Sequence, residues 1–311
     1  MPADIVSTDH GVRIGDLEVL FGVAVKRQLL RANSLILHGP RPIVVDPAAQ
    51  EPRHRELAAG NPILYFTHYH ADHRAAEHVY PASTEVWASE ADAEAIESME
   101  SFVNRVDRGS DGEQLRNSIR GLQMMFRIGP RKVSRRVTDG GLLEAGGCTG
   151  KVMALPGHTP GHSGIYFPGQ SLLFITDIDL TAFGPWYGND ASDITLFKAS
   201  LQRVREFKCD YYFTSHGEEV LTRGRFLEKL DAFEAHFDRR DRLLLEALST
   251  GEKSVDELCR LELVYRSKTL AAMEHMIHFE RKHVKKHLDL LEAAGKVRPV
   301  DESRRRYQLT A

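Results

Sequence analysis

The 311-residue sequence is poor in several features that would assign it to common protein classes. Its three cysteines, Cys148, Cys209 and Cys259, form no Cys-x-x-Cys pair, so we expect a reducing cytoplasm and no disulfide framework. No apolar run reaches the roughly 20 residues of a membrane span, and no membrane partner is expected. The N-terminus has no basic stretch followed by an apolar one, which predicts no secretory signal. A Gly-x-Ser-x-Gly motif, which would supply a serine nucleophile, is also absent.

The overall composition is that of an ordinary globular protein, with 42% hydrophobic and 27% charged residues and a net charge of −3. The length predicts one large domain plus a small one. The charge changes near residue 238, because residues 239–311 carry 16 Lys and Arg against 12 Asp and Glu, a net charge of +4. We therefore predict a domain at 1–238 and a second at 239–311.

Strands and helices alternate in the first domain, which predicts a layered α/β fold. Short β-branched and aromatic runs predict strands at 12–20, 34–37, 43–46, 63–67, 85–88, 151–155, 163–167, 172–176 and 210–214. A helix is predicted from Ser89 through Val103 and another at 195–207. In the second domain we predict helices at 239–248, 255–261 and 271–294, then a hairpin of 296–300 with 305–309. Helices followed by such a hairpin are typical of a winged-helix module.

Histidines are the most distinctive feature, and four candidate metal ligands lie in the segment THYHADH at 67–73, directly after an apolar run. His68 and His70 are two residues apart, so both can point to one side of an extended segment. Asp72 and His73 follow as the loop turns. Imidazoles and carboxylates at this spacing are typical of a metal site.

Three further candidate ligands also stand just beyond the end of an apolar run. His158 follows residues 151–155, Asp177 follows 172–176 and His216 follows 211–214. Loops at strand ends commonly carry functional residues. The regularity predicts that all these side chains converge at one edge of a strand sandwich.

The order His-x-His-x-Asp-His, His158, Asp177, His216 resembles the metallo-beta-lactamase superfamily over about residues 1–238. The resemblance implies an α/β fold, a four-layer αββα sandwich, here followed by a small, mainly helical, winged-helix-like domain. It also implies a two-metal site. His68, His70 and His158 would hold the first metal, Asp72, His73 and His216 the second, and Asp177 would bridge them. Histidine at 70 and a ligand set without cysteine argue against the diiron flavoprotein branch and the antibiotic-hydrolysing β-lactamases.

The chemistry expected of such a site is hydrolysis. Two divalent cations can share a hydroxide and lower the pKa of water from ~15.7 to about 7. We predict a glyoxalase II-like hydrolase whose bridging hydroxide attacks an ester, thioester or lactone of a small-molecule substrate, with Asp72 binding metal and orienting the hydroxide. Zinc is the favoured metal, and iron and manganese are alternatives. A mononuclear iron persulfide dioxygenase is a second alternative, because it uses a very similar segment.

Other residues have weaker signals. His162 could support a ligand or could simply lie in a turn between two strands. Tyr187 and Asn189 follow Asp177 closely and are candidate substrate-binding residues, although an aromatic packing loop is slightly favoured. Residues 90–138 are predicted to form a helical lid insertion, and the part from 115 to 138 carries seven Lys and Arg and no acid.

The second domain introduces one more alternative, a winged-helix-assisted endoribonuclease. Arg304, Arg305 and Arg306 lie in the predicted hairpin, and basic residues crowd the last helix. Acidic residues are interspersed, so we favour a domain that packs against the catalytic domain over one that binds nucleic acid. A homodimer is left open.

Overall fold

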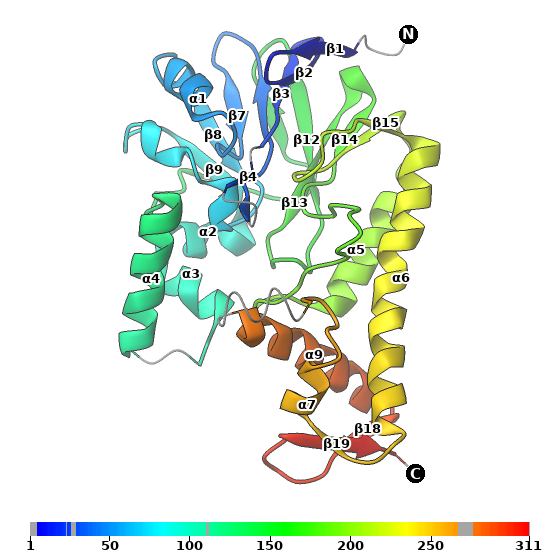
Figure 1. The fold of residues 1–311 in the computed structure, drawn as a ribbon. Helices are drawn as coiled ribbons and strands as arrows, with labels where there is room; N and C mark the ends of the chain where they lie inside the picture. The colour runs from blue at the N-terminus through cyan, green and yellow to red at the C-terminus, as the bar shows by residue number, and fades with distance from the viewer. Residues whose placement is uncertain (1–4, 23, 26–28, 110–111, 267–275, 311) are drawn as a thin grey trace.

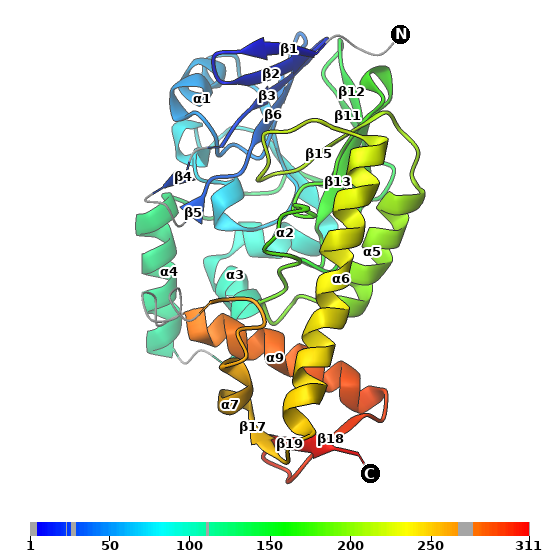
Figure 2. The same ribbon diagram turned by 45° about the vertical axis from the view of Figure 1, so that its right-hand side comes forward.

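The computed structural model of the protein describes residues 5–310 except 23, 26–28, 110–111 and 267–275. Two sheets pack face to face, with helices on both outer faces, which gives the four layers of an αββα sandwich (Figure 1). The predicted fold class is therefore confirmed. A smaller unit of helices and short strands continues from the last helix of the sandwich (Figure 2).

The strands form four sheets. The first has the order β1-β2-β3-β6-β7-β8-β9-β10, with bounds Ile5–Thr8, Gly11–Ile14, Leu17–Leu20, Ser34–Leu37, Ile43–Val45, Ile63–Phe66, Val86–Ser89 and Arg135–Val137. The second has the order β11-β12-β13-β14-β15-β16, with bounds Leu142–Glu144, Thr149–Ala154, Ser163–Phe167, Leu172–Phe174, Tyr211–Phe213 and Leu221–Thr222. A two-stranded sheet pairs β4 (Ala24–Val25) with β5 (Leu29–Leu30). The last sheet, β17-β19-β18, comprises Lys253–Ser254, Arg306–Leu309 and Val297–Pro299.

The central strands of the first sheet, β6, β7 and β8, are apolar on both faces because each face meets a separate core. In β6, Leu35 and Leu37 face the second sheet, whereas Ile36 faces the outer helices. In β8, Tyr65 faces the second sheet and Leu64 faces the outer helices. Successive side chains of a strand point to opposite faces, so a strand buried on both sides reads as an unbroken apolar run.

Helices cover the outer faces of both sheets. α1 (Glu51–Ala58), α2 (Glu90–Glu97), α3 (Met99–Val106) and α4 (Gly112–Phe126) belong to the first sheet's side, and α5 (Ile194–Glu206) and α6 (Arg223–Leu248) to the second's. Two predicted elements are corrected. The strand expected at 12–20 is the hairpin β2–β3, because Gly15 turns the chain with a φ of 60°. The helix expected through Val103 breaks at Ser98, whose side chain accepts a hydrogen bond from the amide of Ser101 and so starts α3.

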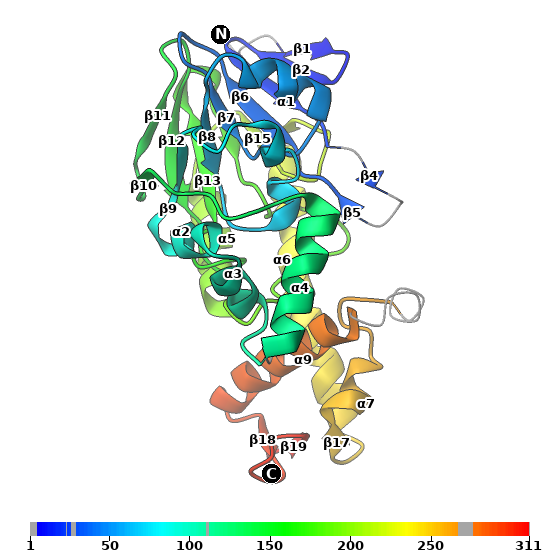
Figure 3. The ribbon, with the colours of Figure 1, turned by 90° about the vertical axis from the view of Figure 1, so that its left-hand side faces the viewer.

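The predicted lid insertion contains α2, α3 and α4, and α4 stands beside α3 (Figure 3). Leu115, Ile119 and Leu122 of α4 pack on the outer core of the first sheet. α4 also contacts η1 (Ala71–His73), a short 3-10 helix that carries two of the candidate ligands. Met124 is 78% exposed on the far side of α4.

The predicted boundary at 238/239 falls inside α6, which runs without interruption from 223 to 248. Beyond it lie α7 (Val255–Cys259) and α9 (Met276–Ala293), and the predicted hairpin of 296–300 with 305–309 is β18 paired with β19. Residues 271–275 of the predicted last helix lie outside the described residues. We call residues 239–310 the C-terminal module.

Several basic residues of this module are engaged within the protein. Lys282 lies 2.9 Å from Asp190 and 3.2 Å from Asp107 of the sandwich. Lys286 donates to the carbonyl of Ser192 at 2.6 Å. Arg304 forms ion pairs with Asp289 and Glu292, and Arg306 with Glu252 and Glu257. These contacts attach α9 to the sandwich and pair two of the arginines in the hairpin with carboxylates. Among the described residues, no helix is long and apolar enough to cross a membrane.

A buried histidine in α1 provides a test of the fold's pH dependence. His54 is fully buried, with Nδ1 2.7 Å from the Tyr80 hydroxyl and Nε2 3.2 Å from Ser34 Oγ, and burial lowers its pKa from 6.5 to about 4. Because the folded pKa is below the unfolded one, its contribution to stability is complete above pH 6.5 and is lost as pH falls through 4. We expect wild type to lose about 3 kcal/mol more than His54→Gln between pH 7 and pH 4.

Urea unfolding at both pH values measures this difference. Glutamine keeps a donor and an acceptor at this position but cannot take up a proton. Every other titrating group is shared by the two proteins and cancels in the comparison. Equal losses in the two proteins would show that His54 does not contribute to acid sensitivity.

Candidate metal centre

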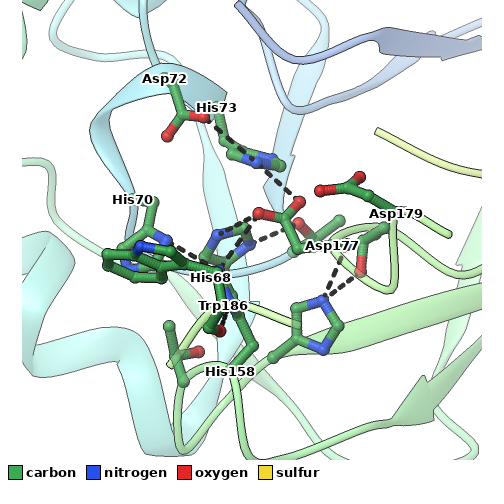
Figure 4. Close-up of polar contacts among 12 residues, drawn as sticks. His68, His70, Asp72, His73, His158, Asp177, Asp179 and Trp186 are labelled. Atoms are coloured by element: carbon green, nitrogen blue, oxygen red, sulfur yellow. Dashed lines mark hydrogen bonds and ion pairs between the residues drawn. The ribbon is translucent and has the colours of Figure 1, made fainter. Parts of the chain in front are cut away.

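The seven predicted ligands meet at one edge of the sandwich, where strands of both sheets end (Figure 4). The two sheets contribute through four loops, the first of which includes η1. His68 and His70 follow β8, Asp72 and His73 lie in η1, His158 follows β12, Asp177 follows β14 and His216 follows β15. The structure thus brings together side chains that lie up to 148 residues apart in the sequence.

A first group consists of His68, His70, His158 and Asp177, each of which offers one ligand atom within 4.8 Å of the others. His158 Nε2 lies 2.9 Å from His70 Nδ1 and 3.1 Å from Asp177 Oδ2. His68 Nε2 lies 3.8 Å from the same carboxylate oxygen. Three imidazoles and one carboxylate around a common point form a donor set suited to zinc or iron.

A second group consists of Asp72, His73 and His216. His216 Nε2 lies 3.4 Å from Asp72 Oδ2, and His73 Nε2 lies 3.9 Å from it. Asp177 faces this group as well, since its Oδ1 lies 3.0 Å from His73 Nε2. One carboxylate therefore stands between the two groups: its Oδ1 faces His73, and its Oδ2 lies 3.1 Å from His158 Nε2 and 3.8 Å from His216 Nε2. Asp72 is 27% exposed and His216 11%, so the second group is the more open to solvent.

The unpaired atoms of the site fit divalent cations. His68 Nε2, His73 Nε2 and Asp177 Oδ1 are buried and have no hydrogen-bond partner among the described residues. His73 Nε2 and Asp177 Oδ1 lie 3.0 Å apart as an ion pair, whereas His68 Nε2 has no such close contact. Buried polar atoms are almost always hydrogen-bonded, so three that are not, gathered at one point, fit a cation site. The opposite nitrogens of these rings are held: His68 Nδ1 is 3.1 Å from Thr67 Oγ1, and His73 Nδ1 is 2.8 Å from Asp46 Oδ2. This is the arrangement that orients metal-binding histidines.

Asp46 was missed in the sequence, although it ends the apolar run 43–46 as the ligands end theirs. It is fully buried and accepts hydrogen bonds from His73 Nδ1, from the amide of Thr67 and from its hydroxyl, at 2.7–2.8 Å. Thr67 in turn contacts His68. Asp46 therefore orients one histidine of the second group directly and one of the first through Thr67.

Burial and charge divide the histidines into two kinds. Burial lowers the pKa of His68 and His70 well below its usual value, so both are neutral and able to bind metal at pH 7. Burial acts in the same direction on His73, but the carboxylates of Asp177 and Asp46 outweigh it and raise its pKa well above the usual value. Burial also lowers the pKa of His158, but the carboxylate of Asp177 outweighs burial and raises it above the usual value. Without metal, these two rings hold protons that a metal would displace.

The loop 156–162, which carries His158, packs closely against α5 and is hydrogen-bonded to α2. Gly157 has a φ of 131°, and a Cβ there would lie 2.2 Å from the amide nitrogen of Phe197, so glycine is required. Asp92 of α2 accepts hydrogen bonds from Thr159 and from the amide of Gly161. This loop therefore shapes the ligand's position.

His162 lies behind Asp177. Its Nδ1 donates to the carbonyl of Leu155 at 2.8 Å, and its Nε2 accepts from Thr176 Oγ1 and from the amide of Asp177. Burial lowers its pKa to about 3, so the ring is neutral. The ring thus contacts the backbone of the carboxylate that stands between the two groups.

The two predicted substrate-binding residues differ in their surroundings. Asn189 Nδ2 lies 2.5 Å from His70 Nε2 and 2.8 Å from the Tyr69 hydroxyl, directly behind a ligand. Tyr187 is fully buried, and its hydroxyl is engaged by Arg240 and His287. Its hydroxyl is therefore not available to a substrate.

Asp179 is a further residue that the sequence did not single out. With Asp177 and His216 it forms a third group of donors, and its Oδ1 accepts from the amide of His216 at 3.3 Å. Burial raises its pKa to about 7. The alternation Asp-Ile-Asp at 177–179 was the available signal, since residues two apart share one side of an extended segment.

Comparison with known proteins agrees with this geometry. The model of the Metallo-beta-lactamase superfamily matches residues 32–216. A Beta-lactamase-like protein 2 homolog of Caenorhabditis elegans is 27% identical over 117 residues, 38% of this chain and 37% of that protein. A Hydroxyacylglutathione hydrolase of Hyphomonas neptunium is 44% identical over 45 residues, 14% of this chain and 18% of that protein. The matches thus span well under two thirds of either curated relative.

Solved structures share the architecture over nearly the whole chain. A metallo-beta-lactamase family protein from Thermus thermophilus has a TM-score of 0.70 at 21% identity, covering 94% of this chain and 98% of that one. A Beta-lactamase domain protein from Burkholderia ambifaria has a TM-score of 0.66 at 18% identity, covering 94% and 91%. At these identities the likeness is one of fold.

Proposed function

Because the chain belongs to the metallo-beta-lactamase superfamily and is a metallohydrolase, we propose that it uses two divalent metal ions, with zinc favoured, to hydrolyse an ester, thioester or lactone. The observation that supports this most is Asp177, whose two oxygens face two separate groups of donors. His68, His70 and His158 would hold the first ion, and Asp72, His73 and His216 the second. The match to a hydroxyacylglutathione hydrolase supports an acyl substrate.

Bound divalent ions would make a hydroxide available at neutral pH and polarise the attacked carbonyl. The chain's own residues do the rest. The metal-binding side chains are held in place by their own hydrogen bonds before substrate arrives, so little reorganisation is needed during the reaction. Asp72 is more exposed than His216 and Asp177 and would accept a hydrogen bond from the attacking nucleophile, which orients it.

The contacts of the C-terminal module favour this function over cleavage of RNA. Three of the basic side chains that could bind phosphates, Lys282, Lys286 and Arg304, are instead paired with carboxylates or backbone carbonyls. The donor set favours two ions over a single iron held by two histidines and one carboxylate.

Metal analysis followed by a substrate panel tests the proposal. Protein purified without chelator or added metal should contain close to two equivalents of zinc, manganese or iron, and should hydrolyse thioesters or lactones in preference to RNA. Chelation should abolish the activity and zinc should restore it. One equivalent of iron with persulfide-dependent oxygen consumption, or cleavage of RNA alone, would contradict the proposal.

A further inference from the structure

A buried arginine of the C-terminal module holds the loop that lies against the first group of ligands. Arg240, in α6, has no exposed surface and no carboxylate within ion-pair distance among the described residues. Its Nη1 donates to the carbonyl of Pro185 and to the Tyr187 hydroxyl, both at 2.7 Å. Its Nη2 donates to the carbonyl of Phe183 at 3.2 Å. Burying a guanidinium costs free energy unless its N–H groups find acceptors, so the positions of these acceptors relative to Arg240 are closely constrained.

α9 holds the same loop, which we call the 183–189 loop, from a second direction (Figure 2). His283 Nε2 accepts from the amide of Tyr187 at 3.2 Å, and His287 Nε2 lies 2.6 Å from the Tyr187 hydroxyl. His287 Nδ1 lies 2.5 Å from Asp241. The chain of donors from Arg240 through Tyr187 and His287 to Asp241 fixes the residue that follows Trp186.

Trp186 lies between these fixed neighbours and touches two ligands of the first group (Figure 4). Its carbonyl accepts a hydrogen bond from His158 Nδ1 at 2.9 Å. Its ring centroid lies 5.5 Å from that of His70 and 5.6 Å from that of His158, and its Nε1 donates to the Tyr265 hydroxyl at 2.5 Å. The carbonyl keeps the proton of His158 on Nδ1 and leaves Nε2 free for metal.

The second group has a separate support in the N-terminal half of the chain. Asn33 is buried and donates through Nδ2 to the carbonyls of Thr214 and Gly217, at 3.0 and 2.6 Å, on both sides of His216. Asp46 holds His73. The second group is therefore oriented from the N-terminal half of the chain, which also supports His68 through Thr67, whereas His158 of the first group is held by the Trp186 carbonyl.

We propose that Arg240 is a positioning residue for the first metal position, and that the C-terminal module sets the affinity of that position by fixing the Trp186 carbonyl. The inference rests on the proposed two-metal function. It gives the module a role in metal binding that requires no nucleic acid. Outer partners of metal-binding histidines typically change metal affinity by about 10–100-fold, so the expected effect is measurable.

The test compares Arg240→Lys with Arg225→Lys, an exposed arginine of the same helix that pairs with Glu228. Both variants carry Trp87→Phe, which leaves Trp186 as the single tryptophan of a chain that has two. Metal-free proteins are titrated with Zn²⁺ against a chromophoric chelator to obtain both stepwise affinities. Titration with Co²⁺, a quencher of tryptophan, reports through Trp186 which step fills the first position.

Lysine offers a point charge that cannot bridge three acceptors, so Arg240→Lys should weaken by about 10–100-fold the step that quenches Trp186 and leave the other step unchanged. Asn33→Ser should show the opposite pattern, and Arg225→Lys should match the parent. Tyr187→Phe removes only the hydroxyl that links Arg240 to His287, and should weaken the same step several-fold even if Arg240→Lys fails to fold.

Unchanged affinities in Arg240→Lys, or equal weakening of both steps, would overturn the inference while leaving the proposed function standing. If Arg240→Lys does not fold, unchanged affinities in Tyr187→Phe overturn it. A parent protein that binds no metal would overturn both the function and the inference, so the two failures are distinguishable.

Discussion

Replacing Asp177 with asparagine should lower kcat/KM for the hydrolysed substrate by about a thousandfold, equivalent to ~4 kcal/mol of transition-state stabilisation. Asp177 Oδ1 faces His73 and its Oδ2 faces His158, so both oxygens are needed as acceptors. Asparagine has no negative charge and has an NH2 group in place of one oxygen. One of the two ligand groups would then face an N–H donor that cannot bind a metal ion. The variant should also retain fewer than two equivalents of metal.

Asp179→Asn is the matched control, because it makes the same chemical change two residues away. Asp179 contacts the backbone of His216, but it does not stand between the two groups. We expect a much smaller loss of activity and close to two metal equivalents. Activity of Asp177→Asn within tenfold of wild type would show that this carboxylate does not join the two positions.

The metal-binding residues could be predicted from the sequence because each of them occurs in the same local pattern. Each predicted ligand follows an apolar run, and buried strands must end at an edge of the sandwich, so the pattern predicted the convergence at His68, His158, Asp177 and His216. The alternation of buried faces in β6 and β8 follows from the same period of two. These features depend on residues close together in the sequence.

The residues that support the ligands were not predictable in this way. Arg240 acts on backbone carbonyls of Phe183 and Pro185, which carry no side-chain signature and lie more than 50 residues away. Asp46 ends an apolar run as the ligands do, but its sequence position does not show that it hydrogen-bonds a histidine instead of facing the metal position. The domain boundary near 238 was predicted from a change in charge, which is a property of surface residues. The helix α6 continues through this position because of its buried residues, which include Phe233, Phe237 and Leu244.

Removing the metal should destabilise the protein more at pH 8 than at pH 6. A ligand present at about a thousand times its Kd stabilises the folded state by ~4 kcal/mol, which corresponds to roughly 6 °C in unfolding temperature for a chain of this size. The pH dependence comes from His73 and His158, whose pKa values in the metal-free protein are raised, against burial, by the carboxylate of Asp177.

A histidine whose folded pKa is raised stabilises the metal-free protein fully below about pH 6.5, and this contribution is lost as pH rises through the folded pKa. Metal must displace the same protons, so it binds more weakly at pH 6 than at pH 8. These are two descriptions of one linkage, and it widens the gap in stability between metal-loaded and metal-free protein as pH rises. Buried neutral histidines outside the site, such as His54, titrate alike in both forms and cancel in the difference.

Calorimetric unfolding of zinc-loaded and chelator-treated protein at the two pH values measures this gap, and Asp46→Asn separates its causes. The substitution removes one of the carboxylates that raise the pKa of His73, so the metal-free protein holds that proton less tightly and the gap should change less with pH. Metal affinity should fall as well, because the ring loses the partner that orients it. A gap that shrinks toward pH 8 would mean that protons on His73 and His158 do not compete with metal, and that the raised pKa values belong to an ion pair that metal binding leaves intact.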